Sequence, residues 1–253
     1  MTRPATELLL ADELFLMLHD QSSGRPRTHP RVAGLGLAAG LLGELMLDGS
    51  VTVASGLLVV VDGRPSPDAL AHDVLGQLVG APRQRTVRIW LDLLAQDALH
   101  EVGQRMVRTG RATRTENRRL WRTFPEYRSV DPEAPRLCES RLRELLDGHA
   151  ARTVSDATLL SLVAAVGLAP HLHLDVDAGE LPAPLHELVV HTATAVAEVP
   201  ERAAGPKRVA GPKRADATKG ADIAQRADAT KRVDVCERVD KRTRAGAGQR
   251  ASG

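Results

Sequence analysis

Apolar residues recur at helical spacing through most of the chain before Pro200, with charged residues between them. Thr6 is expected to cap a first buried helix that includes Leu9, Leu10 and Phe15. A loop rich in Ser, Gly and Pro follows over residues 20–30. The same spacing predicts further helices over 32–47, 85–94, 98–109, 133–146, 156–166 and 185–199. Another helix is expected to begin at a Ser66 cap and to end near residue 79.

Two short hairpins interrupt this helical pattern. Residues 51–53 and 57–61 are rich in Val and Leu and flank the turn signal Ser55-Gly56. Residues 112–115 and 120–124 flank Glu116-Asn117-Arg118 in the same way. The sequence therefore predicts a mainly α fold, in which a single globular helical domain over residues 4–199 carries small β hairpins.

The last part of the chain, residues 200–253, has a different composition. From Ala204 to Ala251 it divides into eight hexads, and the fifth position is Arg in seven of them. The tail holds 14 Lys and Arg against 7 Asp and Glu, a net charge of +7, which leaves 20 basic and 25 acidic residues, or −5, for the domain before it. Low hydrophobicity without aromatic residues predicts a disordered basic tail, with an electrostatic tether for anionic lipid or nucleic acid as the alternative.

Cysteine content and apolar run lengths bear on the compartment. The chain has two cysteines, Cys138 and Cys236, which is too few for a disulfide framework. The apolar run after the N-terminus is broken by charged residues, and the longest uncharged apolar stretch, residues 32–43, is shorter than the roughly 20 residues that span a bilayer. We expect a soluble cytoplasmic protein whose membrane contacts are peripheral.

Several motifs match a known chemistry in part. The G-x-G-x-x-A letters that begin at Gly34 follow a polar loop instead of a strand, so we expect Gly36 and Gly40 to serve close helix packing rather than a dinucleotide. His186 and His191 lie five positions apart, about 140° around a helix, and cannot share a zinc ion.

A second group of possible metal ligands follows Pro170. His171, His173, Asp175 and Asp177 would share one face of an extended chain, but no second ligand-rich segment completes a coordination shell. A solvated turn is the preferred interpretation, with zinc or manganese binding as the alternative. The sequence contains no G-x-S-x-G motif and no phosphate-binding loop, so we expect no catalytic residue, no cofactor and no enzyme activity.

Longer runs of sequence carry a family resemblance. They are residues 7–16 (ELLLADELFL), 40–51 (GLLGELMLDGSV), 88–91 (RIWL), 106–110 (MVRTG) and the Leu- and Ala-rich helix within 158–170. In this order they resemble the Golgi phosphoprotein 3 family, and the likeness spans roughly residues 6–199.

The resemblance implies a mostly helical, non-enzymatic peripheral membrane adaptor. Eukaryotic members bind phosphatidylinositol 4-phosphate at membranes and the cytosolic tails of membrane proteins. The family's headgroup tryptophan falls at His29 here, and its arginines fall at Ala38 and near Gln96 and Leu99. Because those positions hold other residue types, we expect an anionic headgroup to be held beside His29 by the nearby arginines, which are Arg25, Arg27 and Arg31.

The family's hairpin, which inserts into membranes or joins protomers, corresponds to residues 111–124. Here it contains Arg118, Arg119, Leu120 and Trp121. A tryptophan beside arginines suits a lipid interface, because the indole sits at headgroup level while guanidinium groups meet phosphate. In the alternative, Trp121 packs on the helices below it. The resemblance also implies a homo-oligomer formed through this hairpin.

Two other functions remain open. A helix that ends at Gly110 before an arginine-rich hairpin is also typical of a winged helix, whose wing contacts DNA phosphates. The domain is acidic and has no helix with several exposed base-reading side chains, which argues against nucleic acid as a partner. A soluble protein adaptor without lipid binding is the second alternative.

Overall fold

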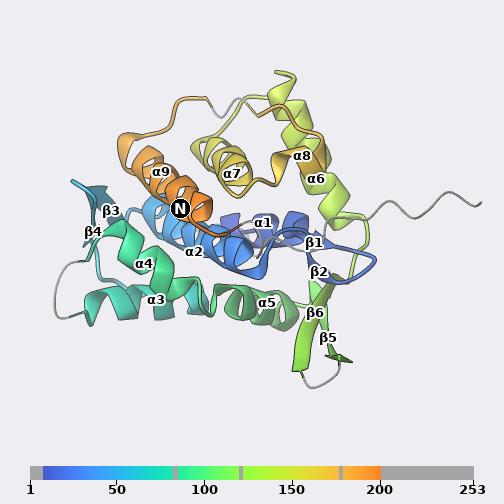
Figure 1. Ribbon diagram of the computed structural model, residues 1–253. Helices are drawn as coiled ribbons and strands as arrows, with labels where there is room; N and C mark the ends of the chain where they lie inside the picture. The colour runs from blue at the N-terminus through green and yellow to red at the C-terminus, as the bar shows by residue number, and fades with distance from the viewer. Residues whose placement is uncertain (1–7, 82–84, 120–121, 177–178, 201–253) are drawn as a thin grey trace, which may run out of the picture. The chain divides into compact units, whose positions relative to one another are not determined.

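The computed structural model describes residues 8–81, 85–119, 122–176 and 179–200. Of these, residues 117–119 and 122–124 are described by their backbone alone. The predicted tail from residue 201 onward therefore lies outside the described residues, as do Leu120 and Trp121. The elements, labelled in Figure 1, are α1 (Leu10–Leu18), β1 (His19–Asp20), β2 (Arg25–Pro26), α2 (Pro30–Leu47), β3 (Val51–Ala54), β4 (Leu57–Val60), α3 (Ala69–Val79), α4 (Val87–Leu94), α5 (Ala98–Arg108), β5 (Ala112–Arg119), β6 (Arg122–Ser129), α6 (Ala134–Leu146), α7 (Val154–Ala165), α8 (Ala169–Leu172) and α9 (Ala183–Ala197).

This element order confirms the predicted mainly α fold with small hairpins. The start of α3 differs from the prediction, because Asp68 rather than Ser66 caps it, accepting the Ala71 N–H at 2.9 Å. The predicted loop over 20–30 contains the small β1–β2 hairpin, and α8 was not predicted. The predicted Thr6 cap lies outside the described residues, and α1 begins after Leu9 without a side-chain cap.

Helix α2 is the centre of the structure. It packs against α1, α4, α5, α7 and α9 (Figure 1). Within the described chain it is the one helix long and apolar enough to cross a membrane. Fourteen of its 18 residues are buried inside the protein, which is the usual environment of an apolar core helix.

Glycines on α2 allow its neighbours to approach closely. A Cβ atom on Gly36 would lie 2.6 Å from Cγ1 of Val166, and one on Gly40 would lie 3.0 Å from Cβ of Ala11. These distances are shorter than van der Waals contact. The structure thus confirms helix packing as the role of Gly36 and Gly40.

The predicted first hairpin is confirmed as β3–β4. Its two-residue turn has Ser55 at φ 53° and Gly56 at φ 75°, the two positive φ values that a tight hairpin turn with strand-matched twist requires. Gly56 adopts a positive φ without steric cost because it has no Cβ atom, whereas Ser55 does not.

The second hairpin is longer than predicted. Strands β5 and β6 pair from Ala112 opposite Ser129 to Arg119 opposite Arg122, so the predicted turn at 116–118 is wrong. Glu116, for example, lies within the ladder opposite Pro125.

A buried aromatic cluster joins the base of this hairpin to α1. The Tyr127 ring meets the Phe15 ring edge-on at 5.4 Å and the His19 ring at 5.9 Å. His19 Nδ1 lies 2.8 Å from the Phe15 carbonyl oxygen, and burial lowers the pKa of the imidazole to about 4. His19 is therefore neutral near pH 7 and donates through Nδ1.

Candidate functional site

A surface cavity of about 300 Å³ lies where α2 begins, between α4 and the end of α9. Its polar lining comes from His29, which precedes α2, Arg31 in its first turn, Arg88 and Asp92 on α4, and Glu198 after α9. Its apolar lining comes from Leu35, Ala195, Val199 and Pro200. The cavity thus gathers charged side chains from three helices that are far apart in the sequence.

Ion pairs hold the charged groups of this cavity together. Arg31 Nη2 lies 2.5 Å from Oδ1 of Asp92, and Arg88 Nε lies 2.9 Å from Oδ2 of the same carboxylate. Arg88 also donates from Nη2 to Oε2 of Glu198 at 2.7 Å. Hydrogen bonds to Glu198 and Asp92 raise the pKa of Arg88, and Arg88 in turn lowers the pKa of Glu198.

The arrangement favours an anion at the start of α2. His29 Nδ1 accepts the Arg31 N–H at 3.1 Å, so the neutral imidazole carries its proton on Nε2 and can donate there. The first turn of α2 contains no acidic residue, so the positive end of the helix dipole is not neutralised within the helix. Two guanidinium groups add bidentate donors. The carboxylates of Asp92 and Glu198 balance those two charges, and an incoming anion has to compete with them.

The predicted lipid-binding residues divide between this cavity and other ion pairs. His29 and Arg31 line the cavity. Arg25 pairs with Glu126 at 3.0 Å and Arg27 pairs with Glu139 at 3.5 Å. The structure therefore brings two of the four predicted residues together in the cavity and places the other two in ion pairs outside it.

The predicted membrane hairpin is described only in part. The backbone places Arg118 and Arg119 in β5, but their side chains, like all of Leu120 and Trp121, lie outside the described residues. Nearer the base, Arg114 pairs with Glu116 at 3.0 Å. Insertion of this hairpin into a membrane, or a dimer formed through it, stays a prediction.

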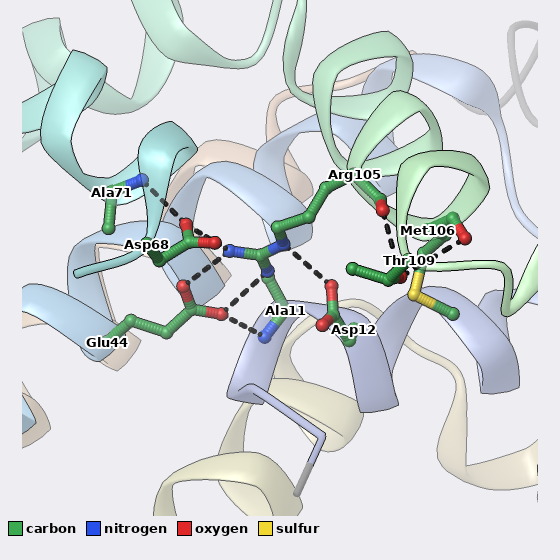
Figure 2. A network of polar contacts seen from close by, with 8 residues as sticks. All are labelled: Ala11, Asp12, Glu44, Asp68, Ala71, Arg105, Met106 and Thr109. Atoms are coloured by element: carbon green, nitrogen blue, oxygen red, sulfur yellow. Dashed lines mark hydrogen bonds and ion pairs between the residues drawn. The ribbon is translucent and has the colours of Figure 1, made fainter. Parts of the chain in front are cut away.

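A second polar cluster lies in the interior around Arg105 of α5 (Figure 2). Its guanidinium donates to Asp12 at 2.8 Å, to both carboxylate oxygens of Glu44 at 2.9 Å and to Asp68 at 3.1 Å. Glu44 also accepts the Ala11 N–H at 2.8 Å. One guanidinium thus joins residues from α1, α2 and the start of α3.

Burial sets the electrostatics of this cluster. It raises the pKa of Glu44 and of Asp12 above their ordinary values, against the opposing effect of Arg105. Burial lowers the pKa of Arg105, but Glu44 and Asp12 raise it by more. Because Arg105 is only 3% exposed and Asp12 4%, a ligand cannot reach these groups while the helices stay packed. We interpret the cluster as structural.

The possible metal ligands after Pro170 do not share an extended face. His171 lies in the short helix α8, and His173 follows it with φ 54°, in the left-handed region. Asp177 lies outside the described residues. In the part of the chain that the structure describes, no three His, Cys, Asp or Glu residues are grouped as metal ligands.

Sequence reasoning missed the other three charged residues of the cavity, Arg88, Asp92 and Glu198. Arg88 and Asp92 have the i, i+4 spacing of a helical ion pair, which is visible in the sequence once α4 is predicted. Glu198 lies 110 positions from Arg88, and no local pattern connects them.

Comparison with models of protein families places the chain. The family model for Golgi phosphoprotein 3 (GPP34) matches residues 10–205. No match is found among curated proteins. The matched segment includes every helix and strand described above and covers well over half of the chain. The chain belongs to the Golgi phosphoprotein 3 (GPP34) family.

Proposed function

We propose that this protein is a non-enzymatic peripheral membrane adaptor that binds anionic phospholipid headgroups in the cavity at the start of α2. One observation carries the proposal: His29, Arg31 and Arg88 line the same cavity of about 300 Å³. In keeping with its family, we place the protein at the cytoplasmic surface of a membrane, where it would recognise the tails of membrane proteins.

Binding requires an exchange of anions at Arg88. Glu198 sits at the rim, with its side chain 60% exposed, so its carboxylate can turn into water at little cost. A phosphate group has more acceptor oxygens and more negative charge than the carboxylate that it replaces, and it suits the planar fork of a guanidinium. Asp92 is less exposed and bonded to both arginines, so it stays in place and holds them toward the cavity.

Vesicle flotation tests this proposal. Phosphatidylcholine vesicles, with and without phosphatidylinositol 4-phosphate or phosphatidylserine, are mixed with the full chain and its variants. Arg88→Gln should weaken binding to anionic vesicles about tenfold, because one charge-assisted hydrogen bond is lost. Glu198→Gln should strengthen binding, because the competing carboxylate is gone.

Arg136→Gln is the matched control. Arg136 is an exposed arginine on α6 that pairs with Glu133 at 2.8 Å, so this variant changes the net charge of the protein equally. Its binding should equal that of the wild type. The proposal fails if the wild type floats with no anionic vesicle, or if the Arg136 and Arg88 variants lose binding to the same extent.

A further inference from the structure

Helix α4 presents three different surfaces to its surroundings. At 100° per residue, Arg88 and Asp92 lie on the flank toward the cavity, and Trp90 lies on the opposite flank. Ile89 and Leu93 lie between these flanks and are 46% and 39% exposed. An aliphatic ridge therefore runs along α4 beside the proposed headgroup site.

A groove adjoins this ridge on the Trp90 side. It has a volume of about 390 Å³ and is lined by the ends of β4 and α3 together with Trp90. The guanidinium of Arg85 lies 5.5 Å above the indole ring. Val61 and Val79, at the groove, are 64% and 58% exposed. Within the described chain, these two valines and the ridge make up four of the eight exposed large hydrophobic side chains.

The area of this surface decides between possible occupants. Four half-exposed aliphatic side chains offer on the order of 200 Å² of apolar surface. A stable protein interface needs about 800 Å² from each partner, so a second copy of the chain or a folded partner finds too little here. A lipid surface needs no minimum area, and a weak apolar anchor suffices where a second, electrostatic contact acts with it.

We propose that Ile89, Leu93, Val61 and Val79 form a membrane-contacting face that enters the acyl region of the bilayer whose headgroups occupy the neighbouring cavity. This inference rests on the proposed function and adds the orientation of the protein on the membrane. The continuity of α4 supports it: Arg88 and Ile89 are successive residues on one short helix, so a headgroup held by Arg88 brings the ridge to the same lipid surface.

A paired substitution tests the contribution of the ridge. Ile89→Ser combined with Leu93→Ser should reduce binding to vesicles of phosphatidylcholine and phosphatidylserine about tenfold. Leu137→Ser is the control, because Leu137 is a 64% exposed leucine on α6, away from this face. The control should bind like the wild type, and circular dichroism should show that all variants are folded at the assay temperature, because none of the replaced side chains belongs to the buried core.

The two tryptophans of the chain report the orientation directly. Trp90 adjoins the proposed face, and Trp121 belongs to the hairpin. Each is retained alone, in Trp121→Phe and in Trp90→Phe, and fluorescence is measured on anionic vesicles that contain phosphatidylcholine with brominated acyl chains. Quenching of Trp90 is expected. If only Trp121 is quenched, the hairpin and not α4 contacts the bilayer, and the inference is overturned.

The outcomes separate this inference from the proposed function. If the wild type binds anionic vesicles and Arg88→Gln weakens that binding, the proposed function stands. Under those conditions, wild-type binding by the Ile89 and Leu93 double variant would overturn the α4 face alone. If the wild type binds no anionic vesicle, the proposed function fails first and the inference fails with it.

Discussion

His19 is expected to make the protein less stable as the pH falls below neutral. Its side chain is 2% exposed, and burial lowers the pKa of the imidazole from 6.5 to about 4. Nδ1 donates to the Phe15 carbonyl oxygen, whereas Nε2 is buried without a hydrogen-bond partner among the described residues. A second proton would therefore place an unpaired charge beside two aromatic rings.

The size of the effect follows from the two pKa values. The unfolded chain takes up the proton near pH 6.5, and the folded protein takes it up only near pH 4. Between these values the unfolded state binds more protons than the folded state. The free energy of unfolding therefore decreases by about 1.4 kcal/mol for each unit by which the pH is lowered. Between about pH 7 and about pH 4.5 the loss is about 2 kcal/mol, and the contribution is fully present above pH 6.5.

Urea unfolding followed by circular dichroism measures this loss. The wild type is compared with His19→Gln at both pH values, because glutamine can still donate to the Phe15 carbonyl oxygen but does not titrate. Every other ionisable group is common to both proteins and cancels in the difference. The variant should lose about 2 kcal/mol less than the wild type on acidification. Equal losses would show that His19 does not titrate as its burial indicates.

Three further predictions concern packing, the buried charges and a thiol. In urea unfolding, Gly36→Ala should lower the free energy of unfolding by about 1–3 kcal/mol, because the added Cβ overlaps with Val166 at the end of α7. Gly76→Ala adds a Cβ that meets no atom within 4 Å, so it should leave the free energy of unfolding unchanged or raise it by up to about 1 kcal/mol. Arg105→Met should cost about 3–5 kcal/mol in the same assay, because it leaves three carboxylates without their cation. Burial raises the pKa of Cys138 to about 12, so a thiol reagent should modify it only after unfolding, while Cys236 in the predicted disordered tail reacts in the folded protein, as mass spectrometry would show.

The helical framework, apart from the short α8, could be predicted because apolar residues recur at helical spacing within each longer helix. Its caps depend on more than local sequence. Ser66 and Asp68 are both good capping residues, and Asp68 caps α3 while also accepting from Arg105, which lies 37 positions away. The local sequence does not decide between the two caps of α3, and the one that the structure uses also takes part in a long-range ion pair.

The second hairpin shows the same limit. Asn117 is a typical turn residue, but it lies in β5 because the ladder begins at Ala112 and runs without a bulge to Arg119. Two buried residues near its base, Ala112 on β5 and Tyr127 on β6, set which face of the hairpin is covered. A one-residue slip would expose that pair, and local turn propensity is too weak to compete with its burial.

Only the residues at or near the family's headgroup position could be predicted for the candidate site. His29 follows from the family's headgroup position, and Arg31 from its nearness to His29. Arg25 and Arg27 look equivalent to Arg31 in the sequence, and all three pair with a carboxylate. Arg31 meets Asp92 inside the cavity, whereas Arg25 and Arg27 meet Glu126 and Glu139 outside it, more than 100 positions away. The sequence shows how many arginines lie near His29, but their positions in the fold decide which of them can contact a ligand in the cavity.

The Arg105 cluster also has a consequence for how α2 finds its position. This helix is apolar on nearly every side, so hydrophobic burial alone leaves its rotation and its axial position poorly determined. A slide by one turn, about 5.4 Å, would carry Glu44 out of reach of Arg105 and leave both charges buried and apart. The cluster therefore selects one docking of a helix that could otherwise pack in several ways. Replacing Asp12 by leucine and both Glu44 and Arg105 by methionine leaves only the partly exposed Asp68 of the cluster, so most of the stability should be preserved. A protein that no longer settles into a single arrangement should nevertheless show weaker near-ultraviolet circular dichroism and broader amide NMR signals.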